Sequence, residues 1–221
     1  MISVIIPAYN EEKYLERTLR SLREQTIGSI EVVVVANGCT DSTVAIARRF
    51  ADRIFAVDRP NVALARNIGA QHARGSLLVF LDADTRLAPN ALAEIRRQFS
   101  AHDAVATLDA YPNAPKLRYH LLLAFKNLLH RARLYTGSSG VIATPASLFH
   151  QVHGFNPRMP IRENHALIRR LKKLGTYKVV RGTYAVTSMR RYERWGLLRA
   201  LFFWLIHRWF VRPRTRYEAV R

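Results

Sequence analysis

Short apolar runs alternate with helical patterns along the first half of the chain. Between the runs, apolar residues recur at intervals of three and four, and Asn10, Asp41, Asn61 and Asn90 precede these segments at positions typical of helix N-caps. The runs are rich in valine, isoleucine and leucine without strict polar alternation, as in strands buried on both faces. We therefore predict an α/β fold with a mostly parallel sheet flanked by helices. The predicted strands are residues 4–6, 32–35, 54–57, 77–81 and 104–108.

The second half has a less regular pattern. Residues 116–134 predict a long apolar and basic helix, and Gly175 would end a helix over residues 163–174. Residues 191–211 predict a last amphipathic helix. The apolar stretches are shorter than the roughly 20 residues that span a bilayer, and the first residues include no basic leader. We expect neither a transmembrane helix nor a signal peptide. Two further strands are predicted over residues 177–180 and 183–187.

Charge is distributed unevenly along the 221 residues. The formal net charge is +19, yet residues 1–115 hold 13 basic and 13 acidic residues. Residues 116–221 hold 22 basic and 3 acidic residues and so carry the whole excess. This asymmetry predicts an anionic partner on one side, which could be nucleic acid, acidic lipid or a phosphorylated substrate. The single cysteine, Cys39, excludes an internal disulfide framework and fits a reducing compartment.

Polar loops follow three of the predicted strands, where ligands bind in open parallel sheets. Asp82 and Asp84 come directly after a buried strand, and in extended backbone their carboxylates would point the same way and share a divalent cation. Such an ion would hold a diphosphate and neutralise charge on a departing phosphate. The alternative is that this triplet is only a turn or a helix cap. The chain has no glycine-rich phosphate loop, which disfavours nucleotide hydrolysis and dinucleotide redox chemistry.

Four short segments of the first half stand out by their residues and their order. They are Ser-Val-Ile-Ile-Pro-Ala-Tyr-Asn-Glu (3–11), Val-Ala-Asn-Gly-Cys-Thr-Asp-Ser-Thr (35–43), Ala-Arg-Asn-Ile-Gly-Ala (65–70) and Leu-Asp-Ala-Asp (81–84). These segments resemble, in the same order, the signatures of the family-two glycosyltransferases of the GT-A fold, and the resemblance covers residues 3–90. It implies an enzyme that moves a sugar from a nucleotide diphosphate sugar to an acceptor hydroxyl, usually with inversion, and uses Mn²⁺ or Mg²⁺.

The resemblance also implies a role for each matching residue. Ala36 and Asn37 stand where the family often has two adjacent acids, so the base that is bound stays open. Each of these residues also has a purely structural alternative, such as ending a strand or packing a helix. The residues implied to flank the nucleotide base are Pro7, Tyr9 and Asn37, with Glu11 nearby. Arg66 is implied to reach the base or the diphosphate. Asp82 is implied to bind the ribose and the metal, and Asp84 to bind the metal at the catalytic centre.

In the second half, Gly-Phe-Asn (154–156), Glu163-Asn164 and residues 167–171 resemble a further family segment. The family's general base is the aspartate that corresponds to Asn164, whose amide cannot accept a proton at neutral pH. Glu163 therefore becomes the candidate base, with a helix N-terminal charge as its structural alternative. A weakened or altered enzyme is one reading of this departure.

Residues 191–195 resemble the (Gln/Arg)-x-x-Arg-Trp motif of processive relatives, in which Arg191 and Arg194 would contact diphosphate or acceptor and Trp195 would stack on a sugar. We prefer the alternative that they begin a basic amphipathic helix. Aromatic residues with flanking arginines are typical of helices at anionic membrane surfaces, and residues 116–134 have a similar character. We expect peripheral binding to the cytoplasmic face of a membrane and a lipid-linked or cell-envelope acceptor; packing on the sheet or dimerisation is the alternative.

We divide the chain into a nucleotide-sugar-binding half (1–115), an acceptor-side half of the same domain (116–190), and a basic C-terminal helix and tail (191–221). Two other classes of protein compete with this interpretation. A nucleotidyltransferase usually has a glycine-rich loop with a basic residue after its first strand, which this chain lacks. A nucleic-acid- or lipid-binding protein would explain the charge and Asn164 but not the aspartate pair, and we expect no nucleic-acid partner.

Overall fold

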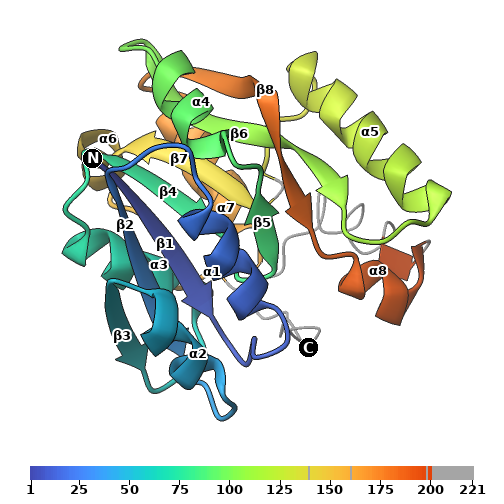
Figure 1. The fold of residues 1–221 in the computed structure, drawn as a ribbon. Coiled ribbons are helices and arrows are strands. Elements are labelled where there is room, and N and C mark those ends of the chain that lie inside the picture. Colours follow the sequence, from blue (N-terminus) through green and yellow to red (C-terminus); the bar gives the residue numbers. More distant parts are fainter. Residues whose placement is uncertain (139, 160, 198, 201–221) are drawn as a thin grey trace.

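A computed structural model describes residues 1–138, 140–159, 161–197, 199 and 200. Within these residues the strands form a single sheet in the order β3-β2-β1-β4-β7-β6-β8-β5, with helices on both faces (Figure 1). Along the chain the elements are β1 (Ile2–Ala8), α1 (Leu15–Arg23), β2 (Ile30–Asn37), α2 (Thr43–Phe50), β3 (Arg53–Val57), α3 (Val62–His72), β4 (Leu77–Leu81), β5 (Thr85–Leu87), α4 (Ala91–Gln98), β6 (Asp103–Pro112), α5 (Leu117–Arg131), β7 (Val141–Pro145), α6 (Ala146–Gln151), α7 (Glu163–Leu171), β8 (Thr176–Thr187) and α8 (Arg190–Trp195).

The five strands predicted for the first half are confirmed as β1, β2, β3, β4 and β6, but the sheet is mixed. Strands β3, β2, β1 and β4 are parallel neighbours, and β6 is parallel to β8. Strand β7 runs antiparallel between β4 and β6, and β5 pairs antiparallel with β8 at the edge. The sequence pattern reports how deeply a strand is buried and not which strand lies beside it, so the insertion of β7 was not predicted.

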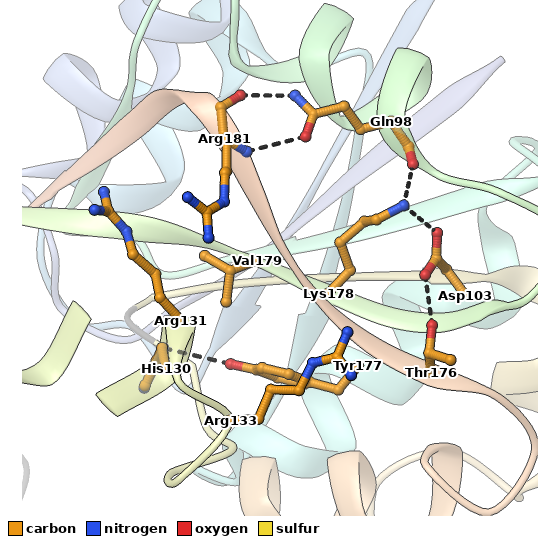
Figure 2. A pocket seen from close by; sticks show the side chains of 10 residues that line it. All are labelled: Gln98, Asp103, His130, Arg131, Arg133, Thr176, Tyr177, Lys178, Val179 and Arg181. Carbon is orange, nitrogen blue, oxygen red and sulfur yellow. Dashed lines mark hydrogen bonds and ion pairs between the residues drawn. The ribbon is translucent and has the colours of Figure 1, made fainter. Parts of the chain in front are cut away.

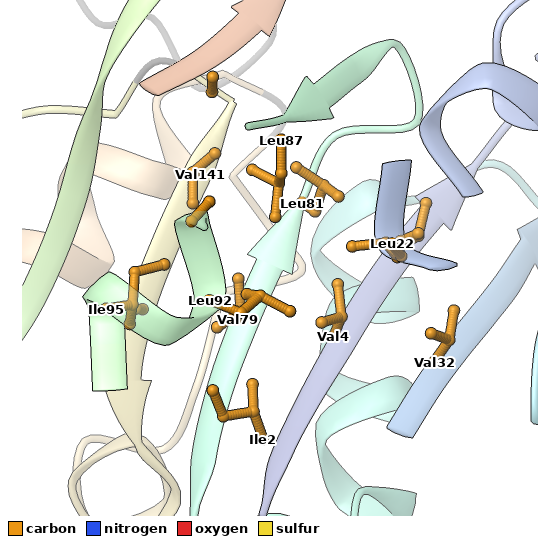
Figure 3. Packing of buried hydrophobic residues seen from close by; sticks show 14 of the residues in the cluster. Ile2, Val4, Leu22, Val32, Val79, Leu81, Leu87, Leu92, Ile95 and Val141 are labelled. Carbon is orange, nitrogen blue, oxygen red and sulfur yellow. The ribbon is translucent and has the colours of Figure 1, made fainter. Parts of the chain in front are cut away.

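Apolar side chains of the strands alternate between two buried clusters, one on each face of the sheet. In β1, Val4 and Ile6 belong to one cluster and Ile5 to the other, and β2 and β4 divide their residues in the same way. Successive side chains of a strand point to opposite faces, so continuous apolar runs suit strands covered on both sides. Helices α1, α2 and α4 contribute to the first cluster, part of which Figure 3 shows, and α3, α6 and α7 to the second.

Of the four expected helix caps, Asn61 makes the predicted bond. Its Oδ1 accepts a hydrogen bond from the backbone N–H of Leu64 at 3.0 Å, at the start of α3. Asn90 holds the N-cap position of α4, but its side chain bonds to β8 and not to the helix. Asn10 and Asp41 lie in the loops before the N-caps of α1 and α2, where their side chains bond each loop to the other. The Oδ1 of Asp41 also accepts a hydrogen bond from the backbone N–H of Thr43, the first residue of α2, at 3.0 Å. Loop packing therefore takes precedence over local capping at Asn10 and Asn90, whereas Asp41 serves both.

In the second half, the two predicted strands form one continuous strand, β8. Its pairing with β6 shifts in register: Val180 pairs with Leu108, and Tyr184 pairs with the next residue of β6, Asp109. The residues between Val180 and Tyr184 form a bulge, in which Gly182 adopts a φ of 74°. Helix α7 ends at Leu171, before the predicted end, and α8 is followed by Gly196 with a φ of 79°. The predicted helix beyond residue 200 lies outside the described residues. Among the helices that the structure describes, none has the length and apolar character needed to cross a bilayer.

Candidate active site

The Asp82-Ala83-Asp84 segment lies where β4 ends, at the carboxyl edge of the parallel strands. The backbone N–H of Asp82 donates to the carbonyl of Gly140 at 2.9 Å, and that of Thr85 donates to the carbonyl of Asp82 at 3.0 Å. The segment is therefore a turn, and the expectation that its backbone is extended is wrong. Asp82 is 40% exposed and Asp84 16% exposed, and each pairs with a different arginine.

Arg66 joins the end of β4 to the start of α7. Its side chain is 5% exposed, and its Nη2 donates to Oδ1 of Asp82 at 2.8 Å. Its Nη1 donates to Oε1 of Glu163 at 2.9 Å and to Oδ1 of Asn164 at 3.0 Å. The guanidinium also lies 5.1 Å from the ring centroid of Phe155. One planar buried cation thus fixes three of the polar side chains that the sequence singled out.

Two neighbours of Arg66 explain why α3 lies so close to the sheet. The amide of Asn67 donates to the carbonyl of Phe155 and accepts from its N–H, both at 2.8 Å. A Cβ at Gly69 would lie 2.4 Å from Cγ2 of Ile5, so only glycine permits this contact between α3 and β1. The structural alternatives therefore hold for Asn67 and Gly69, whereas Arg66 faces the polar edge.

A second arginine, Arg190 in α8, holds the other acids of this edge. Its Nη1 and Nη2 donate to Glu11 at 2.7 and 2.6 Å, and its Nη2 lies 3.1 Å from Oδ2 of Asp84. The guanidinium lies 4.7 Å from the ring centroid of Tyr14. Burial raises the pKa of Asp84 to about 6, and the negative charges of Asp82 and Glu11 add to this effect while Arg190 opposes it. Burial also raises the pKa of Glu11, although Arg190 acts in the opposite direction.

Lys126 and Arg190 also lie at this candidate site, although the sequence did not single them out. Lys126 projects from α5, and its Nζ donates to the carbonyl of Ser138 at 3.1 Å. Burial lowers the pKa of Lys126 to about 8, with Asp82 opposing and Arg191 reinforcing the shift, so these three charges lie within electrostatic reach of one another. No motif distinguished these two cations from the other basic residues of the second half.

The remaining predicted residues differ in how closely they approach this edge. Pro7 is buried within β1, and Tyr9 is half-buried just beyond it. Asn37 is buried, and its Oδ1 accepts a hydrogen bond from the backbone N–H of Asn61 at 2.7 Å, so this side chain fixes the start of α3. Arg194 is exposed. Arg191 interacts with the charges of both aspartates, and its guanidinium lies 6.0 Å from the ring centroid of Trp195.

The donor set at this edge fits a divalent cation. Asp82 and Asp84 supply hard carboxylate oxygens, and the burial of Asp84 beside Glu11 concentrates negative charge that a cation would relieve. Within the described part of the chain, histidine, cysteine, aspartate and glutamate form no group of three or more that could hold a metal. Mg²⁺ is usually bound by one or two carboxylates, with phosphate oxygens and water completing its coordination.

Similar sequences occur in bacterial proteins, several of which have names that describe glycosyltransferases. The family described as glycosyl transferase family 2 matches residues 3–154. Glycosyltransferase GlyA of Streptococcus pneumoniae is 40% identical over 88 residues, which are 38% of this chain and 13% of that protein. Minor teichoic acid biosynthesis protein GgaA of Bacillus subtilis is 32% identical over 135 residues, which are 55% of this chain and 30% of that protein. The chain thus spans less than a third of either relative.

Solved structures share the fold. Staphylococcus aureus TarS, crystallised with UDP-GlcNAc, has a TM-score of 0.65 and 21% identity, covering 84% of this chain and 58% of that one. The mannosyltransferase PcManGT from Pyrobaculum calidifontis, in complex with GDP-Man and Mn²⁺, has a TM-score of 0.69 and 21% identity, covering 92% and 64%. These likenesses establish the GT-A-like architecture. Because the family match extends over more than half of the residues, the chain belongs to glycosyl transferase family 2.

Proposed function

We propose that this chain is the donor-binding and catalytic domain of a metal-dependent glycosyltransferase. It would move a sugar from a nucleotide diphosphate sugar to an acceptor hydroxyl, with inversion at the anomeric carbon. The observation that carries the proposal is the network in which Arg66 binds Asp82 and Glu163 across the sheet edge. The similar folds of TarS with UDP-GlcNAc and PcManGT with GDP-Man and Mn²⁺ support this class of donor.

In this proposal, Asp82 and Asp84 hold Mn²⁺ or Mg²⁺, which when bound would stabilise the negative charge on the departing diphosphate. Tyr9 offers an aromatic face to the base. Lys126 and Arg191 bring positive charge to the phosphate side, since both interact with the charge of Asp82. The other proposed contacts are Pro7, Glu11, Asn37 and Arg66 for the donor, and Arg194 and Trp195 for the diphosphate or acceptor.

Glu163 is the proposed general base. Its contact with Arg66, together with the amide of Asn164 beside it, favours a second candidate function: a homologue that binds donor but transfers sugar weakly. The variant Glu163→Gln separates the two. If Glu163 is the base, this variant loses transfer while donor affinity stays within about twofold, because the neutral amide cannot accept a proton. Undiminished transfer would remove Glu163 from this role.

We further propose that α5 rests on the cytoplasmic face of an anionic membrane and that the acceptor is lipid-linked or part of the cell envelope. Four large apolar side chains lie exposed along one stripe of α5: Leu117, Leu121, Phe125 and Leu128, with 60–70% of each exposed. Arginines on the same helix would attract acidic headgroups. The similarity to a teichoic acid biosynthesis protein supports an envelope acceptor. The donor and acceptor halves would then divide near residue 115.

The metal role of Asp84 is tested with Asp84→Asn. Wild-type protein should show a thermal shift with a nucleoside diphosphate that increases when Mn²⁺ is added. In the variant the Mn²⁺-dependent part should disappear, with donor affinity falling about tenfold or more in titration calorimetry, because an amide is a weak ligand for a hard cation. The matched control is Glu24→Gln, an exposed acid at the end of α1. Unchanged Mn²⁺ dependence in Asp84→Asn would contradict the proposed metal site.

A further inference from the structure

A second polar pocket lies away from the sheet edge described above. It has a volume of about 310 Å³, near the lower end of the range for small-molecule sites. Its walls come from the ends of α4 and α5, the start of β6 and the first half of β8 (Figure 2). The lining residues are Gln98, Asp103, His130, Arg131, Arg133, Thr176, Tyr177, Lys178, Val179 and Arg181.

The pocket contains more positive charge than its acids neutralise. Lys178 Nζ lies 2.6 Å from Oδ2 of Asp103, and Arg131 Nε donates to both carboxylate oxygens of Asp109 at 3.1 and 3.2 Å. The guanidinium groups of Arg133 and Arg181 have no acidic or hydrogen-bonding partner among the residues that the structure describes. After internal pairing, two cations therefore remain for a ligand.

Side chains and backbone bonds hold the walls of the pocket in place. The amide of Gln98 donates to the carbonyl of Arg181 and accepts from its N–H, which fixes α4 against β8. The hydroxyl of Tyr177 donates to the carbonyl of Gly137 at 2.8 Å. Figure 2 shows Val179 surrounded by the side chains of Arg131, Arg133 and Arg181. The apolar surface of Val179 therefore lies among these cations.

This pocket is separate from the proposed donor site. Thr187, whose hydroxyl pairs with that of Thr85 beside Asp84, marks the active-site end of β8. On the neighbouring strand β6, Thr107 pairs with Val179 and Pro112 pairs with Thr187, and these two partners lie five residues apart, which corresponds to about 17 Å of extended chain. A ligand in the pocket would therefore not contact the aspartate pair.

We propose that this pocket binds a small ligand that carries a phosphate dianion, such as a phosphate monoester of a polyol or sugar. Two unpaired guanidinium groups match the charge of the dianion, and their planar donors suit bidentate bonds to phosphate oxygens. Val179 offers an apolar surface for the carbon skeleton. The volume of the pocket is sufficient for such a molecule. The inference stands independently of the transferase activity.

The test compares wild-type protein with the double variant Arg133→Gln/Arg181→Gln. Both side chains are exposed, so the change should leave the fold intact, which circular dichroism checks. Titration calorimetry with inorganic phosphate and with glycerol 3-phosphate should show saturable binding that weakens at least about tenfold in the variant. The charge-matched control is Arg17→Gln/Arg48→Gln on the exposed sides of α1 and α2, which should retain wild-type affinity.

Further binding experiments distinguish a lipid headgroup from a free phosphate ester. If a lipid headgroup enters the pocket, phosphatidylcholine vesicles that contain phosphatidic acid should bind the wild type better than the Arg133→Gln/Arg181→Gln variant. If the ligand is a free phosphate ester, the two proteins should differ in their affinity for glycerol 3-phosphate but not for the vesicles. Equal affinity of wild type and pocket variant for every probe would overturn the proposal. An equal loss in the control variant would also overturn it, because that result indicates diffuse electrostatic attraction. A third probe is a single-stranded oligonucleotide. If the wild type binds it more tightly than glycerol 3-phosphate and the pocket variant does not, the pocket is a nucleic-acid site and the proposal is overturned.

Discussion

Individual buried side chains carry ionisation states that the protein interior imposes. His130 is 1% exposed, and burial lowers its pKa to about 3, with the positive charges of Lys126 and His165 acting in the same direction. Its Nδ1 lies 3.3 Å from the hydroxyl of Tyr177, while its Nε2 is buried without a hydrogen-bond partner among the described residues. A neutral imidazole therefore belongs to the folded state, and protonation opposes folding.

This predicts that the free energy of unfolding falls as the pH falls below 6.5. Below that pH the unfolded chain binds a proton at His130 that the folded chain does not, so the loss continues down to the folded pKa of about 3. Between pH 6.5 and about pH 5, wild-type protein should lose about 1.5 kcal/mol more than His130→Asn in urea denaturation. Phosphate-free buffers keep the nearby pocket empty. Parallel stability curves for the two proteins would contradict the buried neutral histidine.

At the scale of elements, α3 determines where Arg66 lies. The helix is capped by Asn61, fixed to Phe155 by Asn67 and packed on β1 through Gly69. A change in the distance between α3 and β1 would move Arg66 relative to Asp82. The Ala-Arg-Asn-Ile-Gly segment thus combines one residue of the site with two that set its position.

Gly69→Ala is expected to destabilise the fold by about 1–3 kcal/mol, because the added methyl group meets Ile5 at 2.4 Å. Helix propensity alone would make the alanine variant more stable by about 1 kcal/mol. The sign of the measured change in the free energy of unfolding therefore shows whether packing outweighs helix propensity. Urea denaturation measures the effect. Gly28→Ala is the matched control, since no atom lies within 4 Å of its Cβ position, and it should change stability little. A stabilised Gly69→Ala protein would show that α3 does not approach β1 this closely.

At the scale of the whole molecule, positive charge and exposed apolar surface occur in the same half. Residues 116–221 carry the entire net charge of +19, and the exposed stripe of α5 lies in this half. Apolar side chains and basic residues together bind anionic interfaces more strongly than either alone. The opposite half is formally neutral, so attraction to a membrane would orient the protein.

Leu121→Gln/Phe125→Gln should weaken binding to anionic vesicles about tenfold or more, because two apolar side chains no longer enter the interface. Co-sedimentation with phosphatidylserine-containing vesicles measures this, and pure phosphatidylcholine vesicles should bind wild-type protein weakly. Leu64→Gln/Leu174→Gln, at two other exposed apolar positions, serves as the control. If the stripe variant binds as well as the wild type does, α5 is not the membrane contact.

The sequence alone determined the strands of the first half, the burial of the sheet on both faces and the place of Asp82 and Asp84 at its polar edge. These features follow from local periodicity and from the rule that loops after parallel strands meet at one edge. The family resemblance, confirmed over residues 3–154, rests on the same local segments.

Only the tertiary structure decided which distant charges meet. Arg190 binds Glu11 across 179 positions of the chain, and Arg66 binds Glu163 across 97. The insertion of β7 between β4 and β6 and the approach of Lys126 to Asp82 likewise have no local signal. The physical reason is that spacing along a chain fixes which face a side chain occupies, whereas its partner depends on how helices and strands far apart in sequence pack together.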